Sequence, residues 1–432
     1  MKLMVVACAL VFAAPVLAVA CNGGGGEAPT PSPAATATAS PATTASPSPA
    51  ATPTPAPAGS LGEGQIAYVG PDGAHVWLIN ADGSGNRRLT QGQCPQAPMI
   101  LWSPRGDTIA CVSFGGQPQA KLTVVDLDGR ILLEVEPNAE FGYFAWSGNN
   151  HNFVYTIGER GSVWTAGASL VIADTESDAT VRLEDAQNAR WSPDGGQLAY
   201  VKVAGDELTI YDLASGQARA LGQGLRPLAW ALEDEALVVA AGFRVECAGE
   251  CDAYYEANLL DLASGEMTRL PELDNGSQFW LTPDGQAAAF LAGSSERPEG
   301  GLTIAILDLA THTVTSMEGA AFGFPGSEIP PDHIAFSADG AYLHWVDVVF
   351  RQSGTSGTIY RARFDGSGLT QLATAEGSVF VFSPDRTRML YSPDRDRQSL
   401  WVAGVDGSDA QLLVEGIRAD WSRAAWRPPP TP

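Results

Sequence analysis

Side chains that could do chemistry are few in this chain and lie far apart in the sequence. The five histidines are His75, His151, His312, His333 and His344, and none has the spacing of a metal hydrolase. The sequence has neither a Gly-x-Ser-x-Gly nucleophile elbow nor a glycine-rich loop that would cradle phosphate. We therefore expect structural histidines, no identifiable catalytic residue and no cofactor. Enzyme activity stays open, and a non-enzymatic protein is favoured.

Closely spaced carboxylates occur in two short turns, residues 126–129 and residues 394–396. Neither turn fits the longer loop pattern that binds calcium. Repeated aspartates of this kind commonly accept hydrogen bonds from their own backbone. We predict no metal site.

One of the six cysteines lies inside an apolar N-terminal run, and Cys21 ends that run. The other four, an even number in an exported chain, favour disulfides and could pair in three ways. We predict that Cys94 pairs with Cys111 and Cys247 with Cys251. Free buried thiols or a metal site are the alternatives, although a zinc site lacks the usual closely spaced histidines.

The N-terminus has the pattern of an export signal. Lys2 precedes an apolar run from Leu3 to Ala20, and Cys21 follows it. This segment resembles a bacterial lipoprotein signal, which implies that residues 1–20 are removed and that Cys21 carries the lipid. Ala18 departs from the leucine usual at that position. Cleavage without lipidation and an uncleaved membrane helix are the alternatives.

Residues 21–60 are rich in alanine, threonine, serine and proline. They offer too little apolar surface to offset the entropy of ordering, so we predict a disordered tether. A proline-rich chain of this length could reach on the order of 100 Å. Lipid and tether together predict an extracytoplasmic protein anchored to the bacterial cell membrane, with secretion as the alternative.

Acidic residues number 49 and basic residues 25, which gives a formal net charge of -24. This charge repels the phosphates of nucleic acid, so we expect no nucleic-acid partner. It also repels an anionic membrane surface, and we expect membrane contact through the lipid anchor only.

From residue 61 onward, an aromatic residue followed by a turn recurs at spacings of about 40 to 55 residues. The copies open at Trp102, Trp146, Trp191, Trp230, Trp280, Phe336, Phe382 and Trp426. Ser-Pro-Asp-Gly or a close variant follows most of them and suits a type I turn between antiparallel strands. The turns after the second and fourth copies depart from this pattern. We expect the repeated tryptophans to pack between repeats.

Each copy continues with an apolar strand, a third strand that ends in another hairpin, and a short fourth strand. Four antiparallel strands repeated radially predict an all-β fold, a β-propeller whose blades bury their faces against their neighbours. The Trp-Ser-Pro-Asp-Gly repeat with a following Leu-Ala-Tyr resembles the TolB-like propeller repeat over residues 61–428. That resemblance implies protein partners docking at a ring face or channel mouth.

The two ends of this region are expected to share a blade. Residues 65–69 look like a second strand without its first, and residues 423–428 like a first strand without its second. Pairing them would close the ring and protect both edges. The count predicts eight four-stranded blades, with seven as the alternative, and residues 429–432 form a C-terminal tail.

Loops on a rigid scaffold commonly carry binding residues. The longer connections, which we call the loop-rich face, are predicted at residues 159–168, 243–257, 293–301, 318–332 and 350–358. Its binding candidates are Arg160, Trp164, Arg244, Tyr254, Tyr255, Phe322, Phe324 and Arg351. We predict a monomeric, non-enzymatic scaffold that binds a protein, an envelope component or a ligand there. The alternative is an extracytoplasmic propeller enzyme, a polysaccharide lyase or hydrolase, with its site at the central channel.

Overall fold

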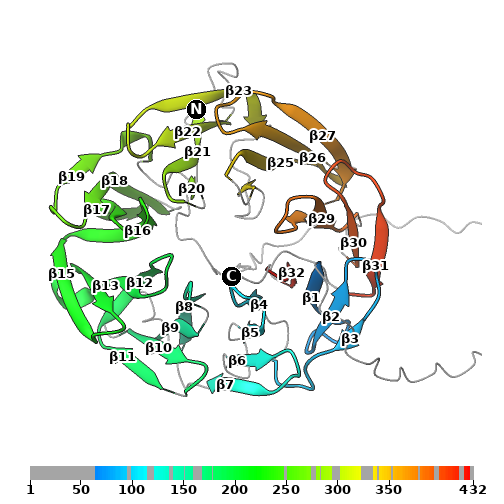
Figure 1. Cartoon of the computed structure of the whole chain (residues 1–432), viewed down its shortest axis with the longest axis horizontal. Helices are drawn as coiled ribbons and strands as arrows, with labels where there is room; N and C mark the ends of the chain where they lie inside the picture. Colours follow the sequence, from blue (N-terminus) through cyan, green and yellow to red (C-terminus); the bar gives the residue numbers. More distant parts are fainter. Residues whose placement is uncertain are drawn as a thin grey trace, which may run out of the picture.

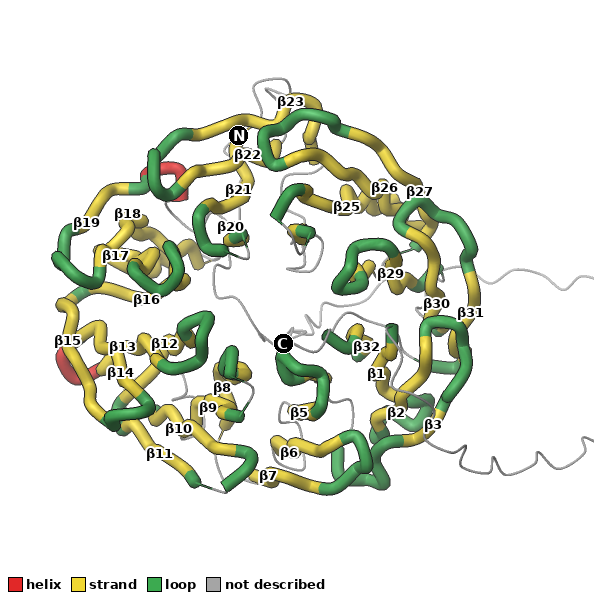
Figure 2. The backbone as a smooth tube through the Cα atoms, viewed as in Figure 1, coloured by secondary structure: helices red, strands yellow, loops and turns green. Residues whose placement is uncertain are grey.

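The computed structural model describes residues 64–428 with short gaps. The gaps are residues 95–98, 114–120, 136–139, 150, 159–167, 178, 248–250, 274–278, 283, 294–301, 323–333, 338–339, 352–353, 378–379, 394–397 and 418–422. Beside several gaps the backbone alone is described. The described elements are β-strands and two single-turn 3₁₀ helices, η1 (Val203–Gly205) and η2 (Pro271–Leu273) (Figure 2).

Eight four-stranded antiparallel sheets form a closed ring, which confirms the predicted eight-bladed propeller (Figure 1). We number the blades around the ring. Blade 1 contains β32 (Ala424–Trp426), β1 (Gln65–Val69), β2 (Val76–Asn80) and β3 (Arg87–Arg88). Blade 2 contains β4 (Met99–Trp102), β5 (Thr108–Ser113), β6 (Lys121–Asp126) and β7 (Ile131–Val135). Blade 3 contains β8 (Glu140–Trp146), β9 (Asn152–Gly158), β10 (Ser169–Asp174) and β11 (Thr180–Leu183).

The remaining blades follow the same order from the ring centre to the rim (Figure 1). Blade 4 contains β12 (Ala186–Trp191), β13 (Gln197–Lys202), β14 (Glu207–Asp212) and β15 (Gln217–Gln223). Blade 5 contains β16 (Leu225–Ala231), β17 (Ala236–Cys247), β18 (Cys251–Asp261) and β19 (Met267–Arg269). Blade 6 contains β20 (Phe279–Leu281), β21 (Ala287–Gly293), β22 (Leu302–Asp308) and β23 (Val314–Phe322). Blade 7 contains β24 (Ile334–Phe336), β25 (Tyr342–Arg351), β26 (Gly354–Arg363) and β27 (Thr370–Glu376), and blade 8 contains β28 (Phe380–Phe382), β29 (Arg388–Tyr391), β30 (Ser399–Gly404) and β31 (Gln411–Glu415).

The hydrophobic core lies between neighbouring blades rather than inside any one of them. Val76 and Leu78 of blade 1 pack in one cluster with Ile109 of blade 2, and all three are 0% exposed. A single sheet has nothing on its own to bury such side chains against, so each blade depends on the next. This arrangement explains the apolar runs of the second and third strands, which are covered on both faces.

The repeated tryptophans pack between blades, as predicted, and their indole nitrogens also fasten one blade to the preceding one. Each acceptor is the carbonyl just before the aromatic residue of the preceding blade. The bonds run from Nε1 of Trp102 to Ala425 (3.1 Å), Trp146 to Leu101 (3.4 Å), Trp191 to Ala145 (3.3 Å), Trp230 to Arg190 (3.0 Å) and Trp426 to Val381 (2.9 Å). Each of these tryptophans therefore packs its ring between two blades and also donates a hydrogen bond to a carbonyl of the neighbouring inner strand.

The chain ends close the ring as predicted. β1 pairs antiparallel with β32, so that Ile66 lies opposite Trp426 and Tyr68 opposite Ala424. Two segments from opposite ends of the sequence thus complete blade 1 (Figure 1). Without β32, the inner edge of β1 would present unpaired backbone groups.

Two segments predicted as irregular loops are instead paired hairpins, one of them with a register shift between Ala241 and Arg244, which corrects that part of the sequence interpretation. In residues 243–257, β17 and β18 continue until Cys247 lies opposite Cys251. In residues 350–358, β25 and β26 continue until Arg351 lies opposite Gly354. The backbone groups pair across each hairpin, and this pairing prevails over the irregular composition of these segments.

Candidate functional site

The antiparallel order of each blade creates two unlike faces of the ring. The turns between first and second strands and between third and fourth strands share one face, which we call the short-turn face. The turns between second and third strands and the connections between blades share the loop-rich face. The two extended hairpins, β17–β18 and β25–β26, therefore project on the loop-rich face.

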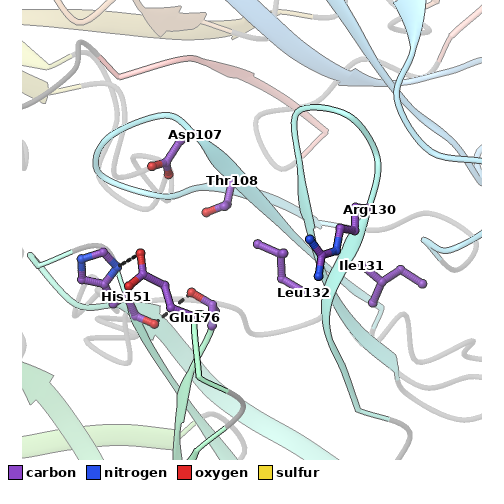
Figure 3. A pocket seen from close by; sticks show the side chains of 8 residues that line it. Asp107, Thr108, Arg130, Ile131, Leu132, His151 and Glu176 are labelled. Atoms are coloured by element: carbon purple, nitrogen blue, oxygen red, sulfur yellow. Dashed lines mark hydrogen bonds and ion pairs between the residues drawn. The ribbon is translucent and has the colours of Figure 1, made fainter.

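A pocket of about 360 Å³ opens on the short-turn face between blades 2 and 3 (Figure 3). Four turns form its walls: those between β4 and β5, β6 and β7, β8 and β9, and β10 and β11. Its lining residues are Asp107, Thr108, Arg130, Ile131, Leu132, His151, Thr175 and Glu176. The volume falls within the range of small-molecule sites.

The first wall is the turn after Trp102, which is held by a serine. The Ser103 hydroxyl donates to Asp107 Oδ1 (2.9 Å) and accepts a bond from the Thr108 amide (3.1 Å). These bonds fix Thr108 at the first position of β5, where its side chain is 9% exposed. The buried Thr108 hydroxyl has no hydrogen-bond partner among the described residues.

The opposite wall joins two turns of blade 3. The amide and hydroxyl of Thr175 both donate to the carbonyl of His151, at 2.8 Å and 3.0 Å. Nδ1 of His151 lies 2.9 Å from Oε1 of Glu176, as Figure 3 shows. Asp174 secures the second turn: burial opposes its ionisation, but bonds from the Glu176 and Ser177 amides and the Ser177 hydroxyl lower the pKa of its carboxyl overall.

Arg130 and two aliphatic residues form the third wall. Asp126 Oδ1 accepts bonds from the amides of Asp128 (3.0 Å) and Arg130 (2.8 Å), which shapes the turn before β7. The Arg130 side chain makes no hydrogen bond or ion pair with the residues that the structure describes. Ile131 beside it is 39% exposed and adds an apolar surface to the pocket.

The pocket gathers charged side chains of both signs around one cavity. Nδ1 of His151 is directed at Glu176, and no nucleophile is hydrogen-bonded to the imidazole among the described residues. The residues that the structure describes also hold no cluster of three or more His, Cys, Asp or Glu side chains that could bind a metal. A cation on one wall and a carboxylate on each of the other two are groups that position a polar ligand.

The ring centre likewise lacks convergent acid and base groups in the described residues. The eight inner strands contain no histidine, and their only carboxylate residue is Glu140. Arg190 of β12 is engaged structurally. Its Nε donates to the carbonyl of Leu228 (2.9 Å), and its guanidinium lies 5.5 Å from the Tyr143 ring. Burial raises the pKa of Tyr143, and the charge of Arg190 partly offsets that effect.

One of the two predicted disulfides is confirmed. Cys94 and Cys111 are bonded, with their Cα atoms 5.7 Å apart, and both residues are at most 1% exposed. The bond fastens the connection between blades 1 and 2 to the second strand of blade 2. Cys247 and Cys251 lie opposite each other at the end of the β17–β18 hairpin, but their side chains fall outside the described part of the chain.

The predicted binding candidates are only partly described. Arg160, Trp164 and Phe324 lie outside the described residues, as does Cys21. Arg244 and Tyr254 are brought together as cross-strand partners in β17 and β18, Phe322 ends β23, and Arg351 ends β25; in all four the backbone alone is described. Tyr255 is 4% exposed and packs in the core between blades 5 and 6, so it anchors the base of the hairpin.

Sequence reasoning did not single out the pocket, because its residues look like ordinary turn residues. One signal was present. The turn after Trp146 departs from Ser-Pro-Asp-Gly and carries His151, the only histidine among the residues that directly precede a second strand. Arg130 is likewise the only arginine directly before a fourth strand. Departures from a repeat mark positions that the repeat itself does not require.

No protein-family model matches the chain. Over 89 residues it is 33% identical to a protein of Pyricularia oryzae named Low-density lipoprotein receptor-related protein 1. The matching stretch is 19% of this chain, and the chain spans only 28% of the length of this curated relative. The match therefore shows no family.

Solved structures share the fold at low sequence identity. Dihydro-heme d1 dehydrogenase NirN in complex with DHE aligns with a TM-score of 0.55 and 15% identity, covering 86% of this chain and 78% of that one. A structure described as the eukaryotic initiation factor has a TM-score of 0.53 and 16% identity, covering 86% and 100%. TolB from Acinetobacter baumannii has a TM-score of 0.35 and 17% identity, covering 74% and 82%. The first two likenesses show the shared fold alone and no shared function.

Proposed function

We propose that the chain is a non-enzymatic binding scaffold that engages a protein partner through the loop-rich face. In this proposal residues 1–20 direct export, a lipid on Cys21 anchors the protein outside the cytoplasm, and residues 21–60 hold the propeller away from the membrane. The protein acts as a monomer. No helix among the described residues is long and apolar enough to cross a membrane.

The observation that carries the proposal is the projection of two paired hairpins from one face. β17 and β18 have 12 and 11 residues, and β25 and β26 have 10 each. The second strands of the other six blades have between 4 and 7 residues. Five extra residues in a strand add roughly 15 Å. The paired strands already hold the hairpin backbone in place. Little further conformational entropy is therefore lost when its side chains contact a partner.

The composition of the ring centre supports a scaffold over a lyase or hydrolase. General acid–base catalysis needs groups within hydrogen-bond reach of one another and of a substrate. The described inner strands carry no histidine and a single carboxylate residue. The repeated tryptophans of these inner strands pack between blades.

The decisive experiment shortens one hairpin and leaves its base intact. In the full chain, residues 245–253 are replaced by Asn-Gly, which suits a two-residue hairpin turn and keeps Tyr255 in the core. Cross-linking on intact cells followed by affinity capture should recover partners with the native chain and lose them with the shortened one. Arg130→Met, on the opposite face, is the matched control and should retain them. Recovery of the same partners by a folded, shortened chain would refute the role of this hairpin.

A further inference from the structure

The pocket between blades 2 and 3 has features that the propeller repeat does not need. Arg130, Thr108 and His151 each occupy a position where other blades carry different residues, so their presence is not explained by blade packing. The pocket also lies on the short-turn face, away from the two extended hairpins. It is therefore a separate candidate site, independent of partner docking on the loop-rich face.

A buried hydroxyl on its wall lacks a partner. The Thr108 side chain is 9% exposed, and its Oγ1 has no hydrogen-bond partner among the described residues. Figure 3 shows this oxygen on the side of Thr108 that faces Glu176 and His151 across the pocket. Buried polar groups in folded proteins are nearly always satisfied, so this hydroxyl offers a hydrogen bond to a polar atom that enters the pocket.

The charges around the pocket are divided between its walls. Arg130 lies on the third wall, whereas Asp107 lies on the first wall and Glu176 on the wall opposite to it (Figure 3). The guanidinium of Arg130 is a planar fork of donors that matches a carboxylate. A purely anionic guest would be repelled by the two carboxylates, and a purely cationic guest by the arginine. A guest that carries both charges can pair with the arginine and with a carboxylate.

The third wall also presents an apolar surface beside Arg130. Ile131, 39% exposed, and the half-buried Leu132 line the pocket next to Arg130. An aliphatic side chain of a guest would remove this surface from water. The volume of about 360 Å³ is sufficient for a single amino acid or a dipeptide.

We propose that this pocket binds a small zwitterion, an amino acid or dipeptide with an apolar side chain. Its carboxylate pairs with Arg130, and its ammonium group lies between Asp107 and Glu176. The Thr108 hydroxyl bonds to the guest, whose side chain contacts Ile131. His151 is a positioning residue, because its contact with Glu176 holds that carboxylate at the pocket.

Isothermal titration of the full chain with L-leucine and glycyl-L-leucine tests the proposal. At least one of the two should bind, whereas N-acetyl-leucine and leucine amide, which each lack one charge, should bind at least tenfold more weakly. Glucose is the neutral probe, and binding of glucose in preference to both zwitterions would overturn the assignment. Failure of both zwitterions to bind, or equal binding of a singly charged analogue, would overturn it too.

Variants separate binding from folding. Arg130→Met should weaken zwitterion binding at least tenfold, and Arg88→Met, which changes an exposed arginine of β3, should leave it within twofold. Thr108→Val should weaken binding while maintaining or raising the melting temperature of the empty protein, because it removes an unpaired buried hydroxyl. Unchanged affinity in Arg130→Met would show that the arginine is not part of the site.

Discussion

Single residues of the repeat perform several tasks at once. The Ser192 hydroxyl accepts a bond from the Gln197 amide (2.9 Å) and donates to Asp194 (2.6 Å), and Asp194 in turn accepts from the Gly196 amide (2.8 Å). The turn is therefore closed by side chains, as the Ser-Pro-Asp-Gly pattern predicts. These residues recur because their side chains satisfy backbone groups in the turns of the repeat.

His344 differs from these turn residues. Its imidazole is buried, and few groups around it would stabilise a positive charge. It lies on β25, is 4% exposed, and its ring centre is 6.0 Å from that of Phe382. Burial, together with the charges of Arg361 and Arg386, lowers its pKa from 6.5 to about 4. Its folded form is therefore neutral under most conditions.

We predict that His344 makes the protein less stable as the pH falls below 6.5. Above that pH the imidazole is neutral in both states and contributes nothing to pH dependence. Between pH 6.5 and about 4 the unfolded imidazole takes up a proton and the folded one does not. The free energy of unfolding should fall by about 1.5 kcal/mol between pH 6.5 and 5 from this residue. Urea unfolding of the native chain and His344→Phe measures the difference; equal losses in both would contradict it.

At the scale of elements, the turn between β16 and β17 lacks the Ser-Pro-Asp-Gly pattern, and its backbone is strained. The amide of Glu235 donates to the carbonyl of Leu232 (3.0 Å), and the two residues between them have positive φ, 52° at Glu233 and 73° at Asp234. This is the left-handed conformation that a tight hairpin turn requires, and glycine or asparagine adopts it at lower cost. Burial and the nearby Asp194 also raise the pKa of the Asp234 carboxyl.

Asp234→Gly should therefore stabilise the protein by about 1 kcal/mol, the lower end of the cost of a left-handed non-glycine residue. Asp234→Ala is the matched control, because it removes the carboxyl but keeps the backbone penalty, and it should stabilise less. Thermal unfolding at neutral pH compares the three proteins. A glycine variant no more stable than the alanine variant would show that the backbone at this turn is not strained.

The repeat made most elements predictable from sequence, because each turn signal has a local mechanism. The strands after Trp102 and Trp191 and the pairing of the two chain ends follow from residue patterns alone. The extended hairpins could not be predicted in this way. Pairing of β17 with β18 beyond residue 243 depends on hydrogen bonds between strands and not on a local turn pattern. The pocket was also out of reach, because Arg130 and His151 are 21 positions apart and meet only where two blades pack.

At the scale of the whole molecule, stability depends on ring closure. Each blade buries its faces against both neighbours, so a missing strand affects two interfaces. Blade 1 is the one blade assembled from both ends of the described chain, and Trp426 of β32 donates to the carbonyl of Val381 in blade 8 (2.9 Å). Arg427, just beyond β32, donates from Nε to the carbonyl of Gly106 in blade 2 (2.6 Å). The C-terminal strand thus links three blades.

Removing residues 424–432 should therefore lower the free energy of unfolding by more than the loss of one three-residue strand would suggest. Truncating a buried tryptophan alone typically costs about 3–5 kcal/mol, and the edge of β1 would also lose its partner. We expect a lower melting temperature and concentration-dependent association through that edge, measured by light scattering after size exclusion. A peptide of residues 418–432 should restore the monomer by strand addition, whereas the same peptide with Trp426→Ala should do so poorly. A truncated chain that remained monomeric and as stable as the full chain would mean that the six interfaces without β32 are sufficient to hold the ring.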